Sequence, residues 1–266
     1  MTTVLTNIDA IFRKELQSYF KSPLYFVIAG FFWVLTALFL LLIAQNIIEQ
    51  AGQMDAGRQL GQSGSPVDVP NLVLQNFLSV MGSILLFVLP VLSMNLYTEE
   101  RKRGTLELLA TSPITNWSVA LGKLFAVVTF VITLIFPVAL LELYLLSTAK
   151  PALPLQIFWV GHLGLVLLAA AVLSIGMFIS SLTDSAIMAA FLTFVVVLLL
   201  WIVNALGQAL GGVLGDALNQ LSLLKHYSTL SQGVLDTPSL ALFLSYIFLG
   251  LFLTAQSIDL FRLQQS

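Results

Sequence analysis

Long apolar blocks separated by short polar stretches dominate the hydrophobic pattern of this chain of 266 residues. A membrane-spanning helix needs about 20 consecutive, mostly apolar residues to cross about 30 Å of hydrocarbon. Six blocks meet this requirement, at residues 24–44, 72–97, 119–145, 155–181, 186–206 and 240–260. The pattern therefore predicts an all-α membrane protein in which residues 1–266 form a single transmembrane domain with six spans.

The composition supports this class and removes several others. Hydrophobic residues make up 58% of the chain and charged residues 9%, against about 25% charged residues in a typical soluble domain. The net charge of −2 provides no basic surface for nucleic acid. The chain has no cysteine, so a thiol nucleophile is excluded. It has two histidines, so it offers few imidazole ligands for a metal site. Phosphate-binding loops and hydrolase motifs are also missing from the sequence. We therefore predict no catalytic residue, cofactor or metal in this chain, and no enzyme activity of its own.

The distribution of basic residues predicts the orientation, because cytoplasmic loops carry more Lys and Arg than external ones. With six spans, both termini and the loop at residues 97–123 lie on one side of the membrane. That side holds eight of the eleven basic residues: Arg13, Lys14, Lys21, Arg101, Lys102, Arg103, Lys123 and Arg262. The other side holds Arg58, Lys150 and Lys225. Both termini are therefore predicted to be cytoplasmic.

An amphipathic segment at residues 7–22 precedes the first span. Its apolar face includes Phe12, Leu16 and Phe20, whereas Arg13 and Lys14 lie on the polar side. This pattern predicts an elbow helix that lies in the membrane interface and bends into the first span at the proline that follows. A basic anchor that only sets the orientation is the alternative interpretation.

The loop at residues 97–123 is the only densely charged passage between long apolar blocks. Within it, residues 104–112 favour a short helix, with Gly104 as a break or N-cap and Glu107 near the positive helix end. Leu106 and Leu109 lie on one apolar face, and Ser112-Pro113 ends the segment. Two helical turns are not stable alone. We therefore expect the leucines to pack against another surface, on a partner or on this chain's own helix ends.

Several predictions concern residues outside this loop. Lys123 is expected to extend toward the cytoplasmic headgroups. The polar stretch at residues 45–70 is expected to be a mobile external loop, and residues 207–238 an external re-entrant segment, with close helix packing at Gly207, Gly211 and Gly215. Glu142 and His162 are expected to be separate interfacial or structural residues near the outer edge.

Residues 99–114, EERKRGTLELLATSPI, followed by Gly122-Lys123, resemble the cytoplasmic loop of ABC-2 type permeases, the membrane subunits of exporters served by a separate ATPase. Residues 221–236 are similar to the segment that these permeases carry before the last span. Among such proteins, the chain most resembles the gliding-motility-associated and nitrous-oxide-reductase-maturation permeases. The resemblance follows the order of the chain from the elbow helix to the last span.

The resemblance implies an architecture like that of type V exporters, in a bacterial inner membrane. It also implies a homodimer, or a dimer with a homologous permease, that binds two copies of a cytoplasmic ATPase, with ATP and Mg held by that partner. Residues 104–112 would be the coupling helix. The implied ATPase-coupling residues are Glu100, Arg101, Arg103, Gly104, Thr105, Leu106, Glu107, Leu109, Ser112 and Pro113. A periplasmic or extracellular accessory protein is also open, because the outer loop at residues 45–70 is longer than in the simplest family members.

Two other functions remain as alternatives. An ion-coupled carrier would use Glu142 as its ion site. A membrane enzyme acting on lipid would use Glu142, His162 or His226, and would need these groups to converge. The helical pattern instead places them in separate external segments, which favours the permease.

Overall fold

The computed structural model describes residues 2–59, 67–105, 115–149 and 152–263. Within these ranges the chain is helical and contains no strand, which confirms the predicted all-α class. The helices are α1 (Thr2–Lys21), α2 (Pro23–Gln59), α3 (Val69–Ser93), α4 (Thr98–Lys102), α6 (Asn116–Ser147), α7 (Leu155–Leu182), α8 (Ala186–Leu210), α9 (Gly212–Leu221), α10 (Leu223–Ser231) and α11 (Thr237–Leu263). Six of the described helical segments are long and apolar enough to cross a membrane.

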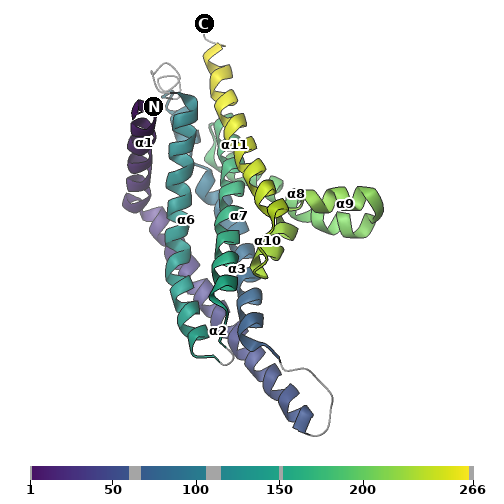
Figure 1. Cartoon of the computed structure of the whole chain (residues 1–266). Helices are drawn as coiled ribbons and strands as arrows, with labels where there is room; N and C mark the ends of the chain where they lie inside the picture. The colour runs from purple at the N-terminus through teal and green to yellow at the C-terminus, as the bar shows by residue number, and fades with distance from the viewer. Residues whose placement is uncertain (1, 60–66, 106–114, 150–151, 264–266) are drawn as a thin grey trace.

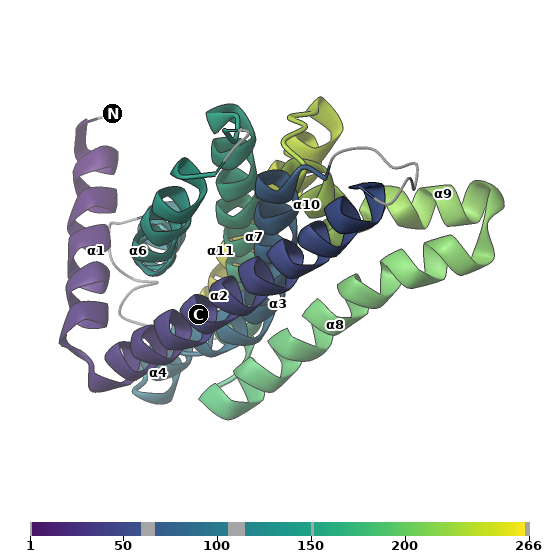
Figure 2. The same cartoon turned by 90° about the horizontal axis from the view of Figure 1, so that it is seen from below.

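Helix α7 lies at the centre of the bundle, with α3, α6 and α11 packed around it (Figures 1 and 2). In the most apolar stretch of α7, 67% is buried inside the protein, compared with 22% in that of α2 and 17% in that of α8. Small residues bring α11 close to α7, because a Cβ on Gly250 would lie 2.5 Å from the backbone of Ser174. The Ser174 hydroxyl also donates to the Tyr246 carbonyl at 3.2 Å. Such close approach of backbones is typical of membrane helices.

Helix α2 is much longer than the first predicted span. At a rise of 1.5 Å per residue, its 37 residues extend about 55 Å, well beyond about 30 Å of hydrocarbon. Residues 45–59, predicted as part of a mobile loop, are therefore helical. Side-chain pairs one turn apart support this extension: Gln45 donates to Glu49 at 3.1 Å, and Gln50 donates to Asn46. The elbow helix also begins earlier than predicted, at Thr2 instead of residue 7.

The predicted external segment folds into two short helices beyond α8. Gly211 and Gly212 have φ angles of 60° and 61°, a conformation that glycine adopts without steric cost, and they turn the chain back on itself. Gly215 then faces Gly207, whose carbonyl oxygen would lie 2.5 Å from a Cβ at position 215. The three glycines therefore do not form one continuous helix face: Gly207 and Gly215 allow close packing, and Gly211 makes the turn. The depth of α9 and α10 in a bilayer stays a prediction.

Candidate functional site

The elbow helix α1 lies along the first half of α6 (Figure 1). Gly122 permits this contact, because a Cβ there would lie 2.8 Å from a methyl carbon of Ile11. On the predicted apolar face, Phe12 and Leu16 are half-buried against the core, and Phe20 is exposed with its ring 5.9 Å from that of Phe130.

The polar side of α1 is solvated. Arg13 and Lys14 are both exposed, and Arg13 pairs with Asp9 at 2.9 Å one turn away. Tyr19, in contrast, is buried against Tyr25, with ring centroids 4.7 Å apart. Burial raises the pKa of the Tyr19 phenol well above its usual value, and the neighbouring acidic groups add to the rise. The tyrosine therefore acts here as a neutral packing residue.

A buried lysine joins three helices at this end of the bundle. The ammonium of Lys123, on α6, lies 3.0 Å from Glu15 Oε1 on α1 and 2.8 Å from Glu100 Oε1 on α4. It also lies 5.0 Å from the centre of the Tyr97 ring. Only 3% of the Lys123 side chain is exposed. The prediction that Lys123 extends to the headgroups is therefore wrong, because two carboxylates within reach supply the counter-charge inside the protein.

Helix α4 is also attached to the central helix α7. The backbone N–H of Tyr97 donates to Ser180 Oγ at 2.8 Å, and Arg101 donates to the Ser181 carbonyl at 2.6 Å. Ser180 and Ser181 both belong to the last turn of α7. Helix α4 is therefore bonded to α7 as well as to α1 and α6.

Gly104 lies at the C-terminal end of α4. Its φ angle is +68°, and its N–H donates to the Arg101 carbonyl at 3.1 Å, while the N–H of Thr105 donates to the Glu100 carbonyl at 2.9 Å. These two bonds form a Schellman motif, which satisfies carbonyls left free at a helix end. The structure therefore confirms the expected break at Gly104, and its role as an N-cap of the following segment stays a prediction.

The rest of the predicted coupling helix lies outside the described residues, including Leu106, Glu107, Leu109, Ser112 and Pro113. The chain on either side of it is held firmly. On one side is the Schellman end of α4. On the other, Thr115 caps α6 by accepting a bond from the Ser118 N–H, and Asn116 donates to Asp259 of α11 at 2.6 Å.

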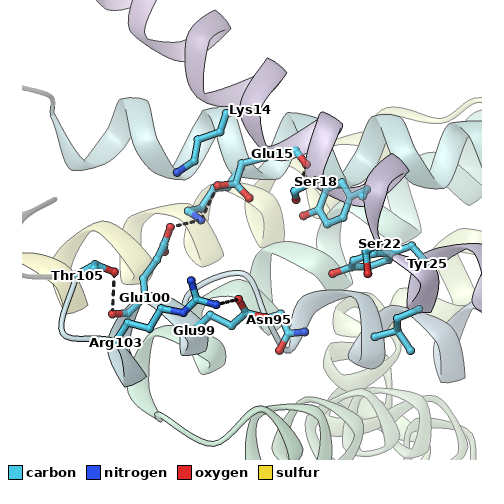
Figure 3. Close-up of a pocket in the computed structure, with 13 residues that line it drawn as sticks. Lys14, Glu15, Ser18, Ser22, Tyr25, Asn95, Glu99, Glu100, Arg103 and Thr105 are labelled. Atoms are coloured by element: carbon cyan, nitrogen blue, oxygen red, sulfur yellow. Dashed lines mark hydrogen bonds and ion pairs between the residues drawn. The ribbon is translucent and has the colours of Figure 1, made fainter.

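A cavity of about 570 Å³ lies between α1 and α4, beside the buried lysine (Figure 3). Both signs of charge line it. Lys14, Glu15, Glu99 and Arg103 contribute, and Glu99 pairs with Arg103 at 3.5 Å. Both members of that pair are exposed, whereas Glu100 points inward to Lys123. Because the charges are balanced, the cavity has no net preference for an anion or a cation.

A family comparison identifies the class of protein to which this arrangement belongs. The family model described as ABC-2 family transporter protein matches residues 10–258. The chain belongs to this family. A search of the curated proteins found none that matches. The predicted membership of the ABC-2 permease family is thereby confirmed, and the likeness to the gliding-motility and nitrous-oxide subtypes stays a prediction.

This ABC-2 protein is therefore a multi-pass permease component of an ABC transporter, a class of membrane subunit that works with an ABC ATPase. It is a transport component and not itself an enzyme. We call the contact region around the buried Lys123, where α1, α4 and α6 meet, the elbow–loop junction. Its members are Glu15, Tyr97, Glu100, Arg101 and Lys123.

Sequence reasoning missed two members of the elbow–loop junction. Glu15 and Tyr97 carry no motif. Glu15 could have been found from its position on the inner face of α1, one turn before Tyr19, facing the same helix as Lys123. Nothing in the sequence indicates that Tyr97 is buried, because a tyrosine next to charged residues is equally typical of a membrane interface.

At the opposite end of α6, the permease brings together two groups that the sequence analysis treated as separate. Glu142 Oε2 lies 3.3 Å from His162 Nε2 on α7, and both side chains are buried. The prediction of separate interfacial residues is wrong, because α6 and α7 are antiparallel neighbours joined by a short connection. His226 does not join them: its ring nitrogens contact Ser239 Oγ at 2.8 Å and the Gln220 carbonyl at 3.1 Å.

Proposed function

We propose that this permease receives force from a separate cytoplasmic ATPase through residues 104–112 and uses it to export a substrate or to transmit force across the membrane. The observation that carries the proposal is the elbow–loop junction, in which Lys123 ties α1, α4 and α6 together at the base of that segment. A push on the segment would therefore act on this junction and on the start of α6 together.

The contacts on either side of the segment support this route. The Schellman bonds of Gly104 hold its entry to α4, and the bond from Arg101 to Ser181 carries displacement on to α7. The Thr115 cap holds its exit to α6. Rigid-body movement of packed helices is a common way in which closure of one domain changes access in another.

The proposed assembly follows the family pattern. Two copies of the ATPase, holding ATP and Mg, would bind two permease subunits from the cytoplasm of a bacterial inner membrane, with both permease termini on that side. The partly buried helices α2 and α8 leave wide apolar faces for lipid or for a second permease. Transport direction and any external accessory protein belong to the same proposal.

The test replaces both proposed contact leucines by aspartate, Leu106→Asp and Leu109→Asp. If each leucine contributes about 1.5 kcal/mol of burial in an ATPase groove, the pair contributes about 3 kcal/mol, or roughly a hundredfold in affinity. We expect the variant to insert into the membrane normally and to lose the ATPase during co-purification. The matched control is Leu106→Met with Leu109→Met, which keeps apolar volume and should retain the partner. Normal co-purification of the aspartate variant would contradict the proposal.

An ion-coupled carrier is the second candidate, because Glu142 and His162 meet inside the bundle. Under that function, Glu142→Gln would stop transport altogether, even with the ATPase bound. Under the function proposed above, ATP-dependent transport continues in this variant. Transport by Glu142→Gln membranes with and without ATP separates the two.

A further inference from the structure

Two titratable side chains lie buried in the membrane domain, away from the elbow–loop junction. Glu142 is 0% exposed on α6, and His162 is 7% exposed on α7. The ring of Phe158 covers the imidazole, with centroids 4.2 Å apart. Ionisable groups are costly to bury and rare within membrane spans, so their presence there is typical of a functional site.

The partners of His162 fix its tautomer. Its Nδ1 lies 2.9 Å from the Phe158 carbonyl oxygen, which can only accept a hydrogen bond. Nδ1 must therefore carry a hydrogen and donate. Nε2 is the atom that faces Glu142 Oε2, at 3.3 Å. A neutral imidazole of this tautomer directs its Nε2 lone pair at the carboxyl group.

This geometry is stable only if one more proton is present. Without it, an ionised carboxylate and an imidazole lone pair face each other in a site that excludes water, and the buried charge has no counter-charge. With it, either the carboxylic acid donates to Nε2 or the imidazolium donates to the carboxylate. Both arrangements have a net charge of zero.

Neighbouring helices offer Glu142 no alternative proton donor among the described residues. Tyr227 on α10 is close enough for the negative charge of Glu142 to contribute to the raised pKa of its buried phenol, after the effect of burial. That phenol donates to the Leu78 carbonyl of α3 instead. Both carboxylate oxygens of Glu142 and Nε2 of His162 lack a hydrogen bond in the described part of the chain, and the 3.3 Å approach brings these unsatisfied atoms together.

We propose that Glu142 and His162 form a proton-binding site inside the membrane domain, holding one proton between Glu142 Oε2 and His162 Nε2. The proton comes from water and forms an O–H or N–H bond, and its binding changes the net charge of the pair from −1 to 0. While it is bound, it links α6 to α7 at the end opposite Lys123. The site does not depend on the proposed ATPase coupling.

The wild-type protein in lipid nanodiscs gives the first test, by ¹⁵N NMR of labelled histidine. The chain has two histidines, and the structure gives them opposite tautomers. His226 donates from Nε2 to the Gln220 carbonyl, whereas His162 donates from Nδ1. For His162 we expect a protonated Nδ1 and an Nε2 that is protonated or accepts a strong hydrogen bond.

Infrared spectra of the same sample locate the proton on the carboxyl side. Comparison with Glu142→Gln should remove a carboxylic acid band if His162 is neutral, or a carboxylate band if it is an imidazolium. An ionised carboxylate beside a neutral His162 would overturn the proposal. These wild-type readings stand even if a variant fails to fold.

The variants provide matched controls. In Glu142→Gln, the amide N–H donates to Nε2 and imitates the protonated pair, so His162 should keep a protonated Nδ1 and an Nε2 that accepts a hydrogen bond. In Glu142→Leu, Nε2 loses its partner, and its NMR signal should shift away from the wild-type position. Identical His162 signals in the wild type and in Glu142→Leu would show that no proton is shared, and would overturn the site.

Discussion

Replacing Lys123 by methionine tests whether the elbow–loop junction depends on its buried charge. Methionine keeps an unbranched chain of similar length and removes the ammonium group. Only 3% of the Lys123 side chain is exposed, and Glu15 and Glu100 are 15% and 19% exposed. The Lys123→Met variant therefore leaves two largely buried carboxylates side by side without the ammonium group that pairs with both.

The expected loss follows from these exposures. Removing one partner of a buried ion pair costs about 3–5 kcal/mol, mostly because the other charge stays buried and unpaired. Both carboxylates retain some contact with water, so we expect the lower end, about 3 kcal/mol. For a chain of this size, 1 kcal/mol corresponds to about 2–4 °C, so the Tm should fall by roughly 6–12 °C. Thermal unfolding of the permease in lipid nanodiscs measures the change.

The control removes every charge of the cluster together, as Glu15→Gln, Glu100→Gln and Lys123→Met. Uncharged replacements of a buried ion pair are often close to neutral, so this variant should recover to within about 1 kcal/mol of the wild type. The reasoning is refuted if Lys123→Met unfolds at the wild-type temperature. It is equally refuted if the triple variant is as unstable as the single one, because the loss would then come from packing and not from charge.

Two further substitutions test single contacts. Gly104→Ala places a side chain at a φ of +68° and should lower the free energy of unfolding by about 1 kcal/mol. Gly104→Asn should lower it less, because asparagine tolerates this backbone region. Equal Tm values for the wild type and both variants would contradict the Schellman assignment. Tyr227→Phe removes the donor to the buried Leu78 carbonyl and should lower the free energy of unfolding by about 1–2 kcal/mol, in equilibrium unfolding compared with the wild type. An unchanged value would show that water or another group already satisfies that carbonyl.

The sequence predicted the apolar spans well, because a bilayer imposes a hydrophobic length that no tertiary contact changes. It failed at residues 45–59 for a related reason. Polarity reports contact with water, and a helix that continues into water is as polar as a loop. The i, i+4 pair of Gln45 and Glu49 was the available signal for a helix there.

The charged contacts were harder to predict, because they depend on which helices become neighbours. Nothing local to Lys123 shows that acids from α1 and α4 reach it. Glu142 and His162 were within reach of sequence reasoning: they lie at similar distances from the short connection between two antiparallel spans, so they face each other if the helices pack. Gly104 was ambiguous, since glycine is typical of both ends of a helix, and the positive φ appears only in the structure.

Helix α6 connects the two buried charged sites. A rise of 1.5 Å per residue puts about 28 Å between Lys123 and Glu142, close to the thickness of the hydrocarbon. One end is held to α1 and α4, and the other to α7. Because breaking either buried contact is costly, a push on residues 104–112 under the proposed coupling would move α1, α4 and the start of α6 as one body.

Pro137 lies between these two ends, inside α6. A proline within a helix removes one backbone hydrogen bond and permits a bend at that point. The start of α6 can therefore follow the elbow–loop junction while Glu142 stays paired with His162. On this argument the far end of α6 serves as the fixed point of the movement for as long as the proton is bound. Loss of that proton would leave Glu142 charged and without a partner, and would weaken the contact between α6 and α7 at that end.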